Sequence, residues 1–300
     1  MFKTKYPQSM PWLEYIAPTQ QQLLDLSAQY HIPLSVLETA LTKTPLSRSQ
    51  HIQNWHWIVC YVPVLGQHSA EYQLASFSVF IRQQQLIIVS ATALSFFDLV
   101  LQRQQHDARP EAVQHAVIDL LHAIAQQFFH TYQQIDLQIM QVESELESSI
   151  KNQQIFRLLA HSKTLNRMAN ALRANCKMLT QLQSQDLLIF PHDPSGLEFS
   201  LADVCDETQQ ALAMTNIQNS NLCNLMDAYA AAVENNLSML VQYLSIYVIL
   251  GAIPLGIASF FGMNTPLPWH DQPWALFDLA LISILISGAL LFILKKRQIT

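Results

Sequence analysis

Residues 240–264 read LVQYLSIYVILGAIPLGIASFFGMN, and this stretch decides the fold. No charged residue occurs between Asn235 and His270, and the apolar run Leu240–Phe261 is long enough to cross a hydrocarbon core of about 30 Å at about 1.5 Å per residue. A soluble helix of that length would normally have a polar face, so we interpret the run as a membrane span. Gly262-Met263-Asn264 follows directly, and a carboxamide at the end of a span suits the mouth of a cation pore.

A second apolar run, Trp274–Leu294, is interrupted only by Asp278 and predicts a second span. Lys295, Lys296 and Arg297 follow it, and clustered basic residues mark the cytoplasmic side of a span. Two spans return the chain to its starting side. We therefore expect a multi-pass inner-membrane protein with both termini in the cytoplasm and residues 262–273 as its outer loop. The N-terminal sequence does not indicate a signal peptide.

The charges are few and unevenly distributed. Only 13% of the 300 residues are charged, half are hydrophobic, and the formal net charge is −6. Between Lys177 and Lys295 there is no Lys or Arg, whereas acids recur: Asp186, Asp193, Glu198, Asp203, Asp206, Glu207, Asp227, Glu234, Asp271 and Asp278. A route lined by this segment would attract cations and repel anions; the ordinary alternative is a solvated acidic helix face. We expect no nucleic-acid partner.

Residues 1–107 are predicted to form a cytoplasmic α/β domain. Thr19-Gln20-Gln21-Gln22 has the pattern of a capping box that opens a helix, and a second helix is predicted from Pro33 to Ala40. A closing helix is predicted over 95–102. Residues rich in β-branched and aromatic side chains predict three strands, at 56–62, 72–81 and 85–90. We find no phosphate-binding loop, nucleophile–base pair or dinucleotide motif, so the sequence does not indicate an enzyme.

Residues 108–239 have a helical pattern throughout. Apolar residues three and four positions apart predict helices over 111–152 and 153–185. A turn around Pro191 and Gly196 separates them from a further pattern that runs from Ser200 to Phe261. Only about a third of such a helix is needed to cross lipid. We therefore expect its first part to be a cytoplasmic stalk and residues 240–300 to be the membrane domain.

The cysteines and histidines form no pattern that specifies a site. Cys60, Cys176, Cys205 and Cys223 are spaced too widely for a zinc site or a disulfide framework, and we expect packed thiols. His115, His122 and His130 lie at near-repeat spacing on a predicted helix. A metal site there is open, although ordinary core or surface histidines are the more common explanation.

These features together resemble the CorA magnesium transporter family. The matching segments are 226–229 (MDAY), 234–238 (ENNLS), Pro254-Leu255 in the first span, and 260–264 (FFGMN). The resemblance implies a funnel-shaped homopentamer in membrane lipid, with α/β/α sandwich domains in the cytoplasm and five first spans around the axis. Two spans per chain cannot enclose a pore, so the expected assembly is consistent with a conduit. Gly262, Met263 and Asn264 would form the selectivity filter: a ring of Asn264 carboxamides would engage hydrated Mg²⁺ through its waters, Gly262 would permit close backbone approach, and Met263 would pack the mouth.

Other residues receive candidate roles from helical spacing, from the resemblance, or from their charge alone, as the regulatory acids do. The expected inward stripe of the first span is Ser238, Val241, Leu244, Val248, Ala252 and Leu255; the alternative is helix packing in lipid. Asp227 would form an acidic ring at the inner end of the pore, with an exposed stalk carboxylate as the alternative. No cofactor is expected. Mg²⁺ is the expected cargo and a regulatory ion as well, with Asp203, Asp206 and Glu207 as candidate regulatory ligands.

Two departures from the family pattern leave the cargo open. Pro254 stands one residue nearer Asn264 than in the family, and residues 265–271 read TPLPWHD where the family usually has Met-Pro-Glu. Asp271 would replace the missing acid in attracting cations, whereas His270 would suit Co²⁺, Ni²⁺ or Zn²⁺. The leading expectation is passive Mg²⁺ uptake driven by the membrane potential. The alternatives are a Zn²⁺ or Ni²⁺/Co²⁺ transporter on the same scaffold, with or without proton coupling, and a non-conducting sensor or scaffold.

Overall fold

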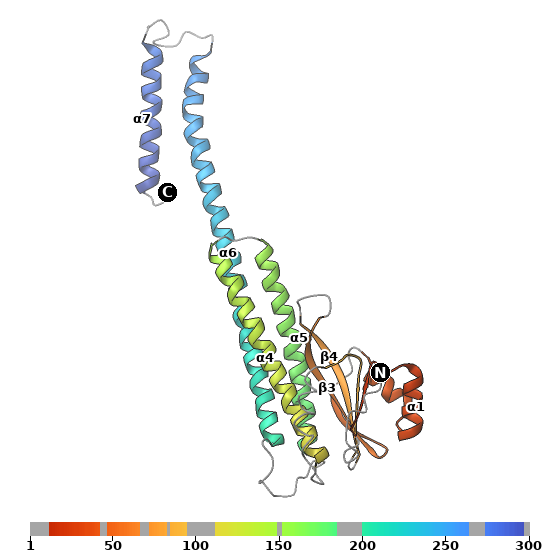
Figure 1. Ribbon diagram of the computed structural model, residues 1–300. Helices are drawn as coiled ribbons and strands as arrows, with labels where there is room; N and C mark the ends of the chain where they lie inside the picture. The colour runs from red at the N-terminus through yellow and green to blue at the C-terminus, as the bar shows by residue number, and fades with distance from the viewer. Residues whose placement is uncertain are drawn as a thin grey trace. The chain divides into compact units, whose positions relative to one another are not determined.

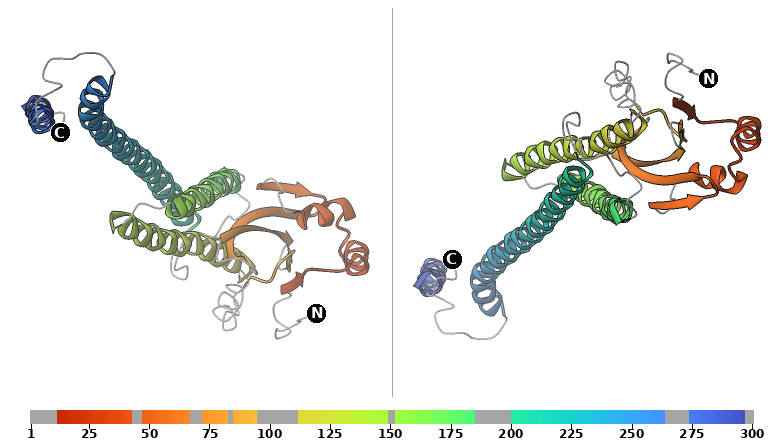
Figure 2. Two further views of the ribbon diagram at one scale, coloured as in Figure 1. Left: turned by 90° about the horizontal axis from the view of Figure 1, so that it is seen from above. Right: turned by 90° about the horizontal axis from the view of Figure 1, so that it is seen from below.

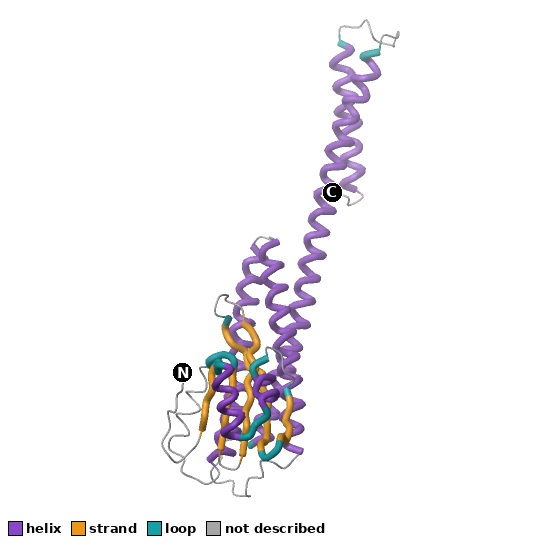
Figure 3. Tube along the Cα trace, turned by 90° about the vertical axis from the view of Figure 1, so that its right-hand side faces the viewer, coloured by secondary structure: helices purple, strands orange, loops and turns teal. Residues whose placement is uncertain are grey.

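The structure is a computed structural model that describes residues 12–42, 47–66, 72–82, 85–94, 112–148, 152–184, 200–263 and 274–296. Its elements are β1 Trp12–Ile16, α1 Gln20–Tyr30, α2 Leu34–Ala40, β2 Arg48–Ile52, β3 Trp55–Leu65, β4 Tyr72–Arg82, β5 Gln85–Ser90, α4 Ala112–Ser148, α5 Asn152–Ser184, α6 Leu201–Phe261 and α7 Ala275–Lys296. Within the described residues, strands occur only in the N-terminal third, and the regular structure from residue 112 onward is helical (Figure 3).

The five strands form one mixed sheet in the order β1-β5-β4-β3-β2. β3 and β4 pair antiparallel from His56 opposite Ile81 to Leu65 opposite Tyr72. β1 closes one edge by pairing parallel with β5, and β2 closes the other by pairing antiparallel with β3. Helices α1 and α2 cover one face of this sheet, and α4 and α5 cover the other (Figures 1 and 2). The predicted α+β class and the α/β/α layering are confirmed, but the second helical layer is formed by α4 and α5, which lie beyond the predicted domain boundary at residue 107.

The core between the sheet and α1–α2 follows from strand alternation. Trp55, Trp57 and Val59 project from the same face of β3 because successive side chains of a strand point to opposite sides. They pack with Leu23, Leu26, Ile32, Leu37, Ala40, Phe80, Ile87 and Val89, all of them buried. Full burial of one such aliphatic side chain is worth about 1.5–3 kcal/mol. This apolar layer fixes the two short helices on the sheet.

The predicted start of α1 is confirmed in atomic detail. The Gln22 backbone N–H donates to Oγ1 of Thr19 at 3.4 Å, and Oε1 of Gln22 accepts from the Thr19 backbone N–H at 2.8 Å. This reciprocal pair satisfies two donors that a helix N-terminus would otherwise leave without a partner. The helix that begins after Pro33 is also confirmed, as α2.

The sequence pattern did not predict β1 and β2. Both are five-residue strands at the edges of the sheet, and β2 (RSQHI) has no alternation of apolar and polar residues. It is positioned by contacts that a local pattern does not reveal: its residues pair with β3, and the Arg48 guanidinium lies 4.5 Å from the centre of the Trp57 ring. Such a cation–π contact contributes about 0.5–2 kcal/mol.

The long helices are confirmed with small shifts at their ends. The predicted segments 111–152 and 153–185 correspond to α4 and α5, and the segment that begins at Ser200 is α6. The first part of α6 packs on the other two helices, because Gln218 donates to Asp136 of α4 at 2.6 Å and Ser162 of α5 donates to Asn219 at 3.0 Å. The helix predicted over 95–102 lies outside the described residues.

The chain divides into two compact units, residues 1–226 and 227–300. Helix α6 contributes residues to both of them. The predicted three-part division, with boundaries after residues 107 and 239, stays a prediction.

Candidate ion-conducting site

Helix α6 continues without interruption to Phe261, and its last third is the predicted first span. By length and composition, α6 qualifies as a membrane-crossing helix. The described apolar run of α7, Phe277–Ile293, is shorter than a full span. The first predicted span is therefore supported, and the second stays a prediction. Pro254 lies inside α6; because proline has no backbone N–H, it leaves out one hydrogen bond of the helix.

The predicted filter begins where α6 ends. The Gly262 N–H donates to the Ala258 carbonyl at 2.9 Å, and the Met263 N–H donates to the Phe260 carbonyl at 3.4 Å. A Cβ atom on Gly262 would lie 3.3 Å from the Ala258 oxygen, so a larger residue here would press on the last turn. Met263 is half exposed. Asn264, the residue on which the filter prediction depends most, lies outside the described residues, as do His270 and Asp271.

The predicted inward stripe lies on one face of α6. Four of its members are large side chains that are highly exposed in the single chain, with 62–71% of their surface accessible: Val241, Leu244, Val248 and Leu255. Ser238 and Ala252 are exposed as well. Apolar side chains that stay exposed over several turns of one helix face need a partner in lipid or in another chain. The assignment of these residues to a pore stays a prediction.

The opposite face of α6 turns toward α7. The least exposed positions of the span recur every three or four residues: Gln242, Ile246, Leu250, Ile253, Ile257 and Phe261. At about 100° per residue, they centre on the side of the helix opposite the predicted inward stripe. Ile257 and Phe261 also line the groove that α6 shares with α7. The predicted stripe is therefore the side of α6 that α7 leaves free.

The groove between α6 and α7 has a volume of about 910 Å³. Half of the residues that line it are small, the kind that allows helices to approach closely in lipid. From α6 these are Ala258 and Gly262, and from α7 they are Ala280, Ser283, Ser287 and Gly288. Small side chains of the two apolar helices therefore face each other across this groove.

Asp227 precedes the first predicted span, and the basic residues follow the second. Asp227 is exposed on α6, as expected both for a ring member and for an ordinary stalk carboxylate. Helix α7 ends at Lys296, whose side chain is exposed. The side chain of Lys295 and all of Arg297 lie outside the described residues, so the roles of these three residues stay predictions.

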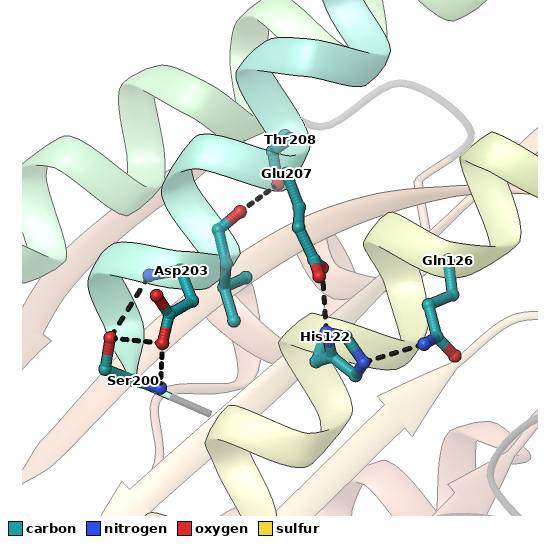
Figure 4. Close-up of polar contacts among 7 residues, drawn as sticks. His122, Gln126, Ser200, Asp203, Glu207 and Thr208 are labelled. Atoms are coloured by element: carbon teal, nitrogen blue, oxygen red, sulfur yellow. Dashed lines mark hydrogen bonds and ion pairs between the residues drawn. The ribbon is translucent and has the colours of Figure 1, made fainter. Parts of the chain in front are cut away.

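Two of the three candidate regulatory acids, Asp203 and Glu207, have identifiable partners within the chain (Figure 4). Oδ2 of Asp203 accepts from the Ser200 backbone N–H at 2.8 Å and from its hydroxyl at 2.7 Å, which caps the start of α6. These hydrogen bonds hold the pKa of Asp203 below its ordinary value because they stabilise the ionised carboxylate. Glu207 accepts from Nδ1 of His122 at 2.8 Å, and Asp206 is exposed. Regulatory metal binding by the three acids stays a prediction.

The contact between His122 and Glu207 was not foreseen from the sequence. His122 is 97% buried between α4 and α6, and its Nε2 accepts from the amide of Gln126 at 2.7 Å. Within one subunit, the described part of the chain holds no group of three His, Cys, Asp or Glu side chains that could bind a metal ion. His122 thus fixes two helices together, while His115 is buried and His130 exposed on the same helix.

The cysteines are free thiols, as expected from their spacing. Cys60 and Cys205 are buried, and burial raises their pKa values, so that both stay protonated at neutral pH. Cys223 is exposed on α6, so the expectation that all four cysteines are packed is wrong for this residue.

Comparisons with known proteins agree with this architecture. The sequence model of the CorA-like Mg²⁺ transporter protein family matches residues 7–297. A cobalt/magnesium transport protein CorA of Methanocaldococcus jannaschii is 18% identical over 283 residues, which cover 92% of this chain and 87% of that protein.

Three solved structures share the fold. The complete CorA magnesium transporter of Methanocaldococcus jannaschii superposes with a TM-score of 0.80 at 16% identity, covering 95% of this chain and 89% of that one. The full-length CmaX protein superposes with a TM-score of 0.70 at 12% identity, covering 93% of this chain and 88% of that one. The cytoplasmic domain of ZntB from Vibrio parahaemolyticus RIMD 2210633 superposes with a TM-score of 0.61 at 9% identity, covering 78% of this chain and 91% of that one. The resemblance stated from the sequence is confirmed: this chain belongs to the CorA-like Mg²⁺ transporter family, whose members are membrane transporters of divalent cations.

Proposed function

We propose that this chain forms a homopentameric channel that conducts divalent cations, with Mg²⁺ as its main cargo, across the inner membrane. One observation carries the proposal: the apolar end of α6 leads directly into Gly262-Met263 and leaves the predicted inward stripe on the side away from α7. Two helices cannot enclose a conduit, whereas five copies of α6 around an axis can.

Asn264 would place a ring of carboxamide oxygens at the outer mouth. Mg²⁺ prefers octahedral oxygen ligands and loses its waters reluctantly, so amide and carbonyl oxygens suit contact through the hydration shell. Gly262 has no side chain, so its backbone can approach an ion or a neighbouring subunit closely at this point. We assign to Asp271 the attraction of cations from the outside.

Below the mouth, the inward stripe would form the wall of the pore. Val241, Leu244, Val248 and Leu255 would narrow it with apolar side chains, and such a constriction gates by excluding water. Asp227 would then concentrate cations at the inner end. The absence of Lys and Arg between residues 177 and 295 supports cation rather than anion passage.

The membrane potential would drive uptake. With both termini in the cytoplasm, as the basic residues at the end of the second predicted span favour, a divalent ion that moves inward gains about 4.6 kcal/mol per 100 mV. Internal Mg²⁺ bound by Asp203, Asp206 or Glu207 at subunit contacts would oppose further entry, since carboxylates brought together repel one another until a cation neutralises them.

A second candidate is a transporter of Zn²⁺, Ni²⁺ or Co²⁺ on the same scaffold, with or without proton coupling. Two observations support this second candidate. ZntB is among the structural neighbours, and the relative from Methanocaldococcus jannaschii is named a cobalt/magnesium transport protein. His270 in the outer loop would supply an imidazole, which these ions bind better than Mg²⁺ does.

The test is ion flux into proteoliposomes that contain the purified full-length chain and a Mg²⁺-sensitive dye. We expect uptake that a more negative interior accelerates and that Asn264→Ala abolishes. Asn236→Ala is the matched control, because it makes the same change on an exposed part of α6 outside the apolar span and should leave flux unchanged.

Three outcomes would contradict the proposal in different ways. Zn²⁺ flux without Mg²⁺ flux would favour the second candidate, and dependence on a proton gradient would add proton coupling. Equal loss of flux in both asparagine variants would remove the special role of Asn264. No flux of any divalent ion in an assembled oligomer would favour a non-conducting scaffold.

A further inference from the structure

The hairpin formed by β2 and β3 places two histidines side by side. His51 of β2 lies directly opposite His56 of β3, and the two residues flank the turn that joins the strands. Their ring centroids are 4.8 Å apart, with the ring planes inclined at 74°. His51 is exposed on the edge strand, whereas His56 is only 6% exposed beneath it. One imidazole is therefore open to water, and its neighbour is buried.

The two ring nitrogens of His56 differ in their surroundings. Nε2 lies 2.7 Å from the hydroxyl oxygen of Ser49, whereas Nδ1 is fully buried and has no hydrogen-bond partner. Burying an N–H group that has no acceptor costs more free energy than burying a nitrogen lone pair that has no donor. The favoured tautomer of His56 therefore carries its proton on Nε2 and donates it to the Ser49 hydroxyl oxygen. This leaves the lone pair of Nδ1 without a partner.

The surroundings also keep His56 neutral. Burial, together with the neighbouring His51, lowers its pKa to about 4. At neutral pH the ring is thus in the form that binds metals. A ligating histidine commonly donates its second N–H to a nearby polar group, which fixes its orientation. The Ser49 hydroxyl is the polar group that accepts the second N–H of His56.

The spacing of the two rings fits a shared ion. Imidazole nitrogens bind Zn²⁺ at about 2.0–2.1 Å, and two of them on a tetrahedral ion place their ring centroids about 5 Å apart. The 4.8 Å between the ring centroids of His51 and His56 is close to this value, and the exposed His51 can rotate its side chain to turn a ring nitrogen toward the ion.

The geometry points to a binding site for one divalent transition-metal ion between His51 and His56, with Nδ1 of His56 as the inner ligand and Ser49 as a positioning residue. Water on the side of the exposed His51 completes the coordination shell, since the described residues supply no third His, Cys, Asp or Glu to it. Imidazole suits Zn²⁺, Ni²⁺ and Co²⁺, whereas Mg²⁺ prefers oxygen ligands. The site lies in the soluble domain, and its existence does not depend on the proposed transport.

Zn²⁺ is the probe, titrated into the purified full-length protein against a chromophoric chelator. Millimolar Mg²⁺ is present throughout, so that oxygen sites for hard cations remain occupied. We expect the parent protein to bind one more Zn²⁺ per subunit than His51→Ala, or to bind it at least 10-fold more tightly. Ser49→Ala should weaken the same site by about 10-fold or more, as loss of an outer-shell partner does. His130→Ala removes an exposed histidine elsewhere and should bind like the parent.

A second readout separates binding from misfolding. His51 is exposed at a sheet edge, so His51→Ala should retain the parent melting temperature in the absence of Zn²⁺. Added Zn²⁺ should raise that temperature in the parent but not in the variant, because an ion that binds the folded state stabilises it. Equal Zn²⁺ binding and equal thermal shifts in parent and His51→Ala would overturn the inference. So would absence of Zn²⁺ binding in the parent, or displacement of the ion by Mg²⁺ at similar concentrations.

Discussion

Replacement of Asn175 by alanine should weaken the attachment of the C-terminal third of α5 to the sheet. Asn175 is 97% buried, and its side-chain amide donates to the Tyr61 carbonyl at 2.9 Å while its oxygen accepts from the Tyr61 N–H at 3.0 Å. The last β2–β3 pair is Arg48 opposite Val59, so Tyr61 lies beyond the end of the neighbouring strand. The asparagine takes the place of that missing strand, and it also accepts from the Ser47 hydroxyl at 3.2 Å.

The expected cost follows from these contacts. Asn175→Ala removes three hydrogen bonds and takes away the α5 partner of the Tyr61 N–H and C=O. A buried polar group that loses its partner costs about 1–3 kcal/mol. Because Tyr61 is only half-buried, water can replace part of the loss. We expect the free energy of unfolding of the soluble domain to fall by about 2–4 kcal/mol.

The measurement is a urea titration of the full-length protein, followed by fluorescence of the buried Trp55 and Trp57. Asn170→Ala is the control: this residue is exposed one turn earlier on α5, and its loss should cost less than about 0.5 kcal/mol. Hydrogen exchange at the Tyr61 amide supplies a local readout and should accelerate only in Asn175→Ala. Equal stability of the two variants, with unchanged protection of Tyr61, would refute the reasoning.

Two further predictions concern the helix starts. Thr19→Ala should destabilise the soluble domain by about 1 kcal/mol through loss of the α1 cap, as measured by the urea midpoint, whereas Gln21→Ala in the same turn should have little effect; equal shifts would argue against the capping box. The folded-state pKa of Asp203 is lowered from its ordinary 3.8, so its stabilising contribution is present above that value and is lost as the pH falls through the lower folded pKa. Asp203→Asn should therefore reduce the melting temperature at pH 7 but not in strong acid, and a deficit that persists in strong acid would contradict this assignment.

Elements that bury a continuous face could be predicted from the sequence. Helices α4, α5 and α6 repeat apolar residues at three and four positions for many turns, and β3, β4 and β5 are rich in β-branched and aromatic residues. Their burial is decided by local periodicity, so the pattern reveals both the type of element and the side that packs. The α1 cap was predictable for a related reason, since all of its hydrogen bonds join residues three positions apart.

Features that depend on distant partners could not be predicted. β2 is polar and becomes a strand only because β3 lies beside it. Asn175 and Tyr61 are separated by 114 positions, and His122 and Glu207 by 85, so no local spacing announces either contact. The His51–His56 pair depends on the same unforeseen strand. If the pairing of residues 48–52 with β3 had been known, the pair of histidines would have been predictable. Antiparallel register places residues on either side of a short turn opposite one another.

The position of α6 in both units bears on how ion passage could be regulated. Its first part is held to α4 by the contacts of His122 with Glu207 and of Asp136 with Gln218. Its last part carries the predicted pore face. These contacts are made by side chains that can exchange partners, not by the backbone of the helix, so they can be rearranged without unfolding α6. A change at the soluble end can therefore bias the pore only if α6 has two packed arrangements with different contacts to α4. The two arrangements would be recognised by the hydrogen bond between His122 and Glu207, which would be present in one of them and lost in the other.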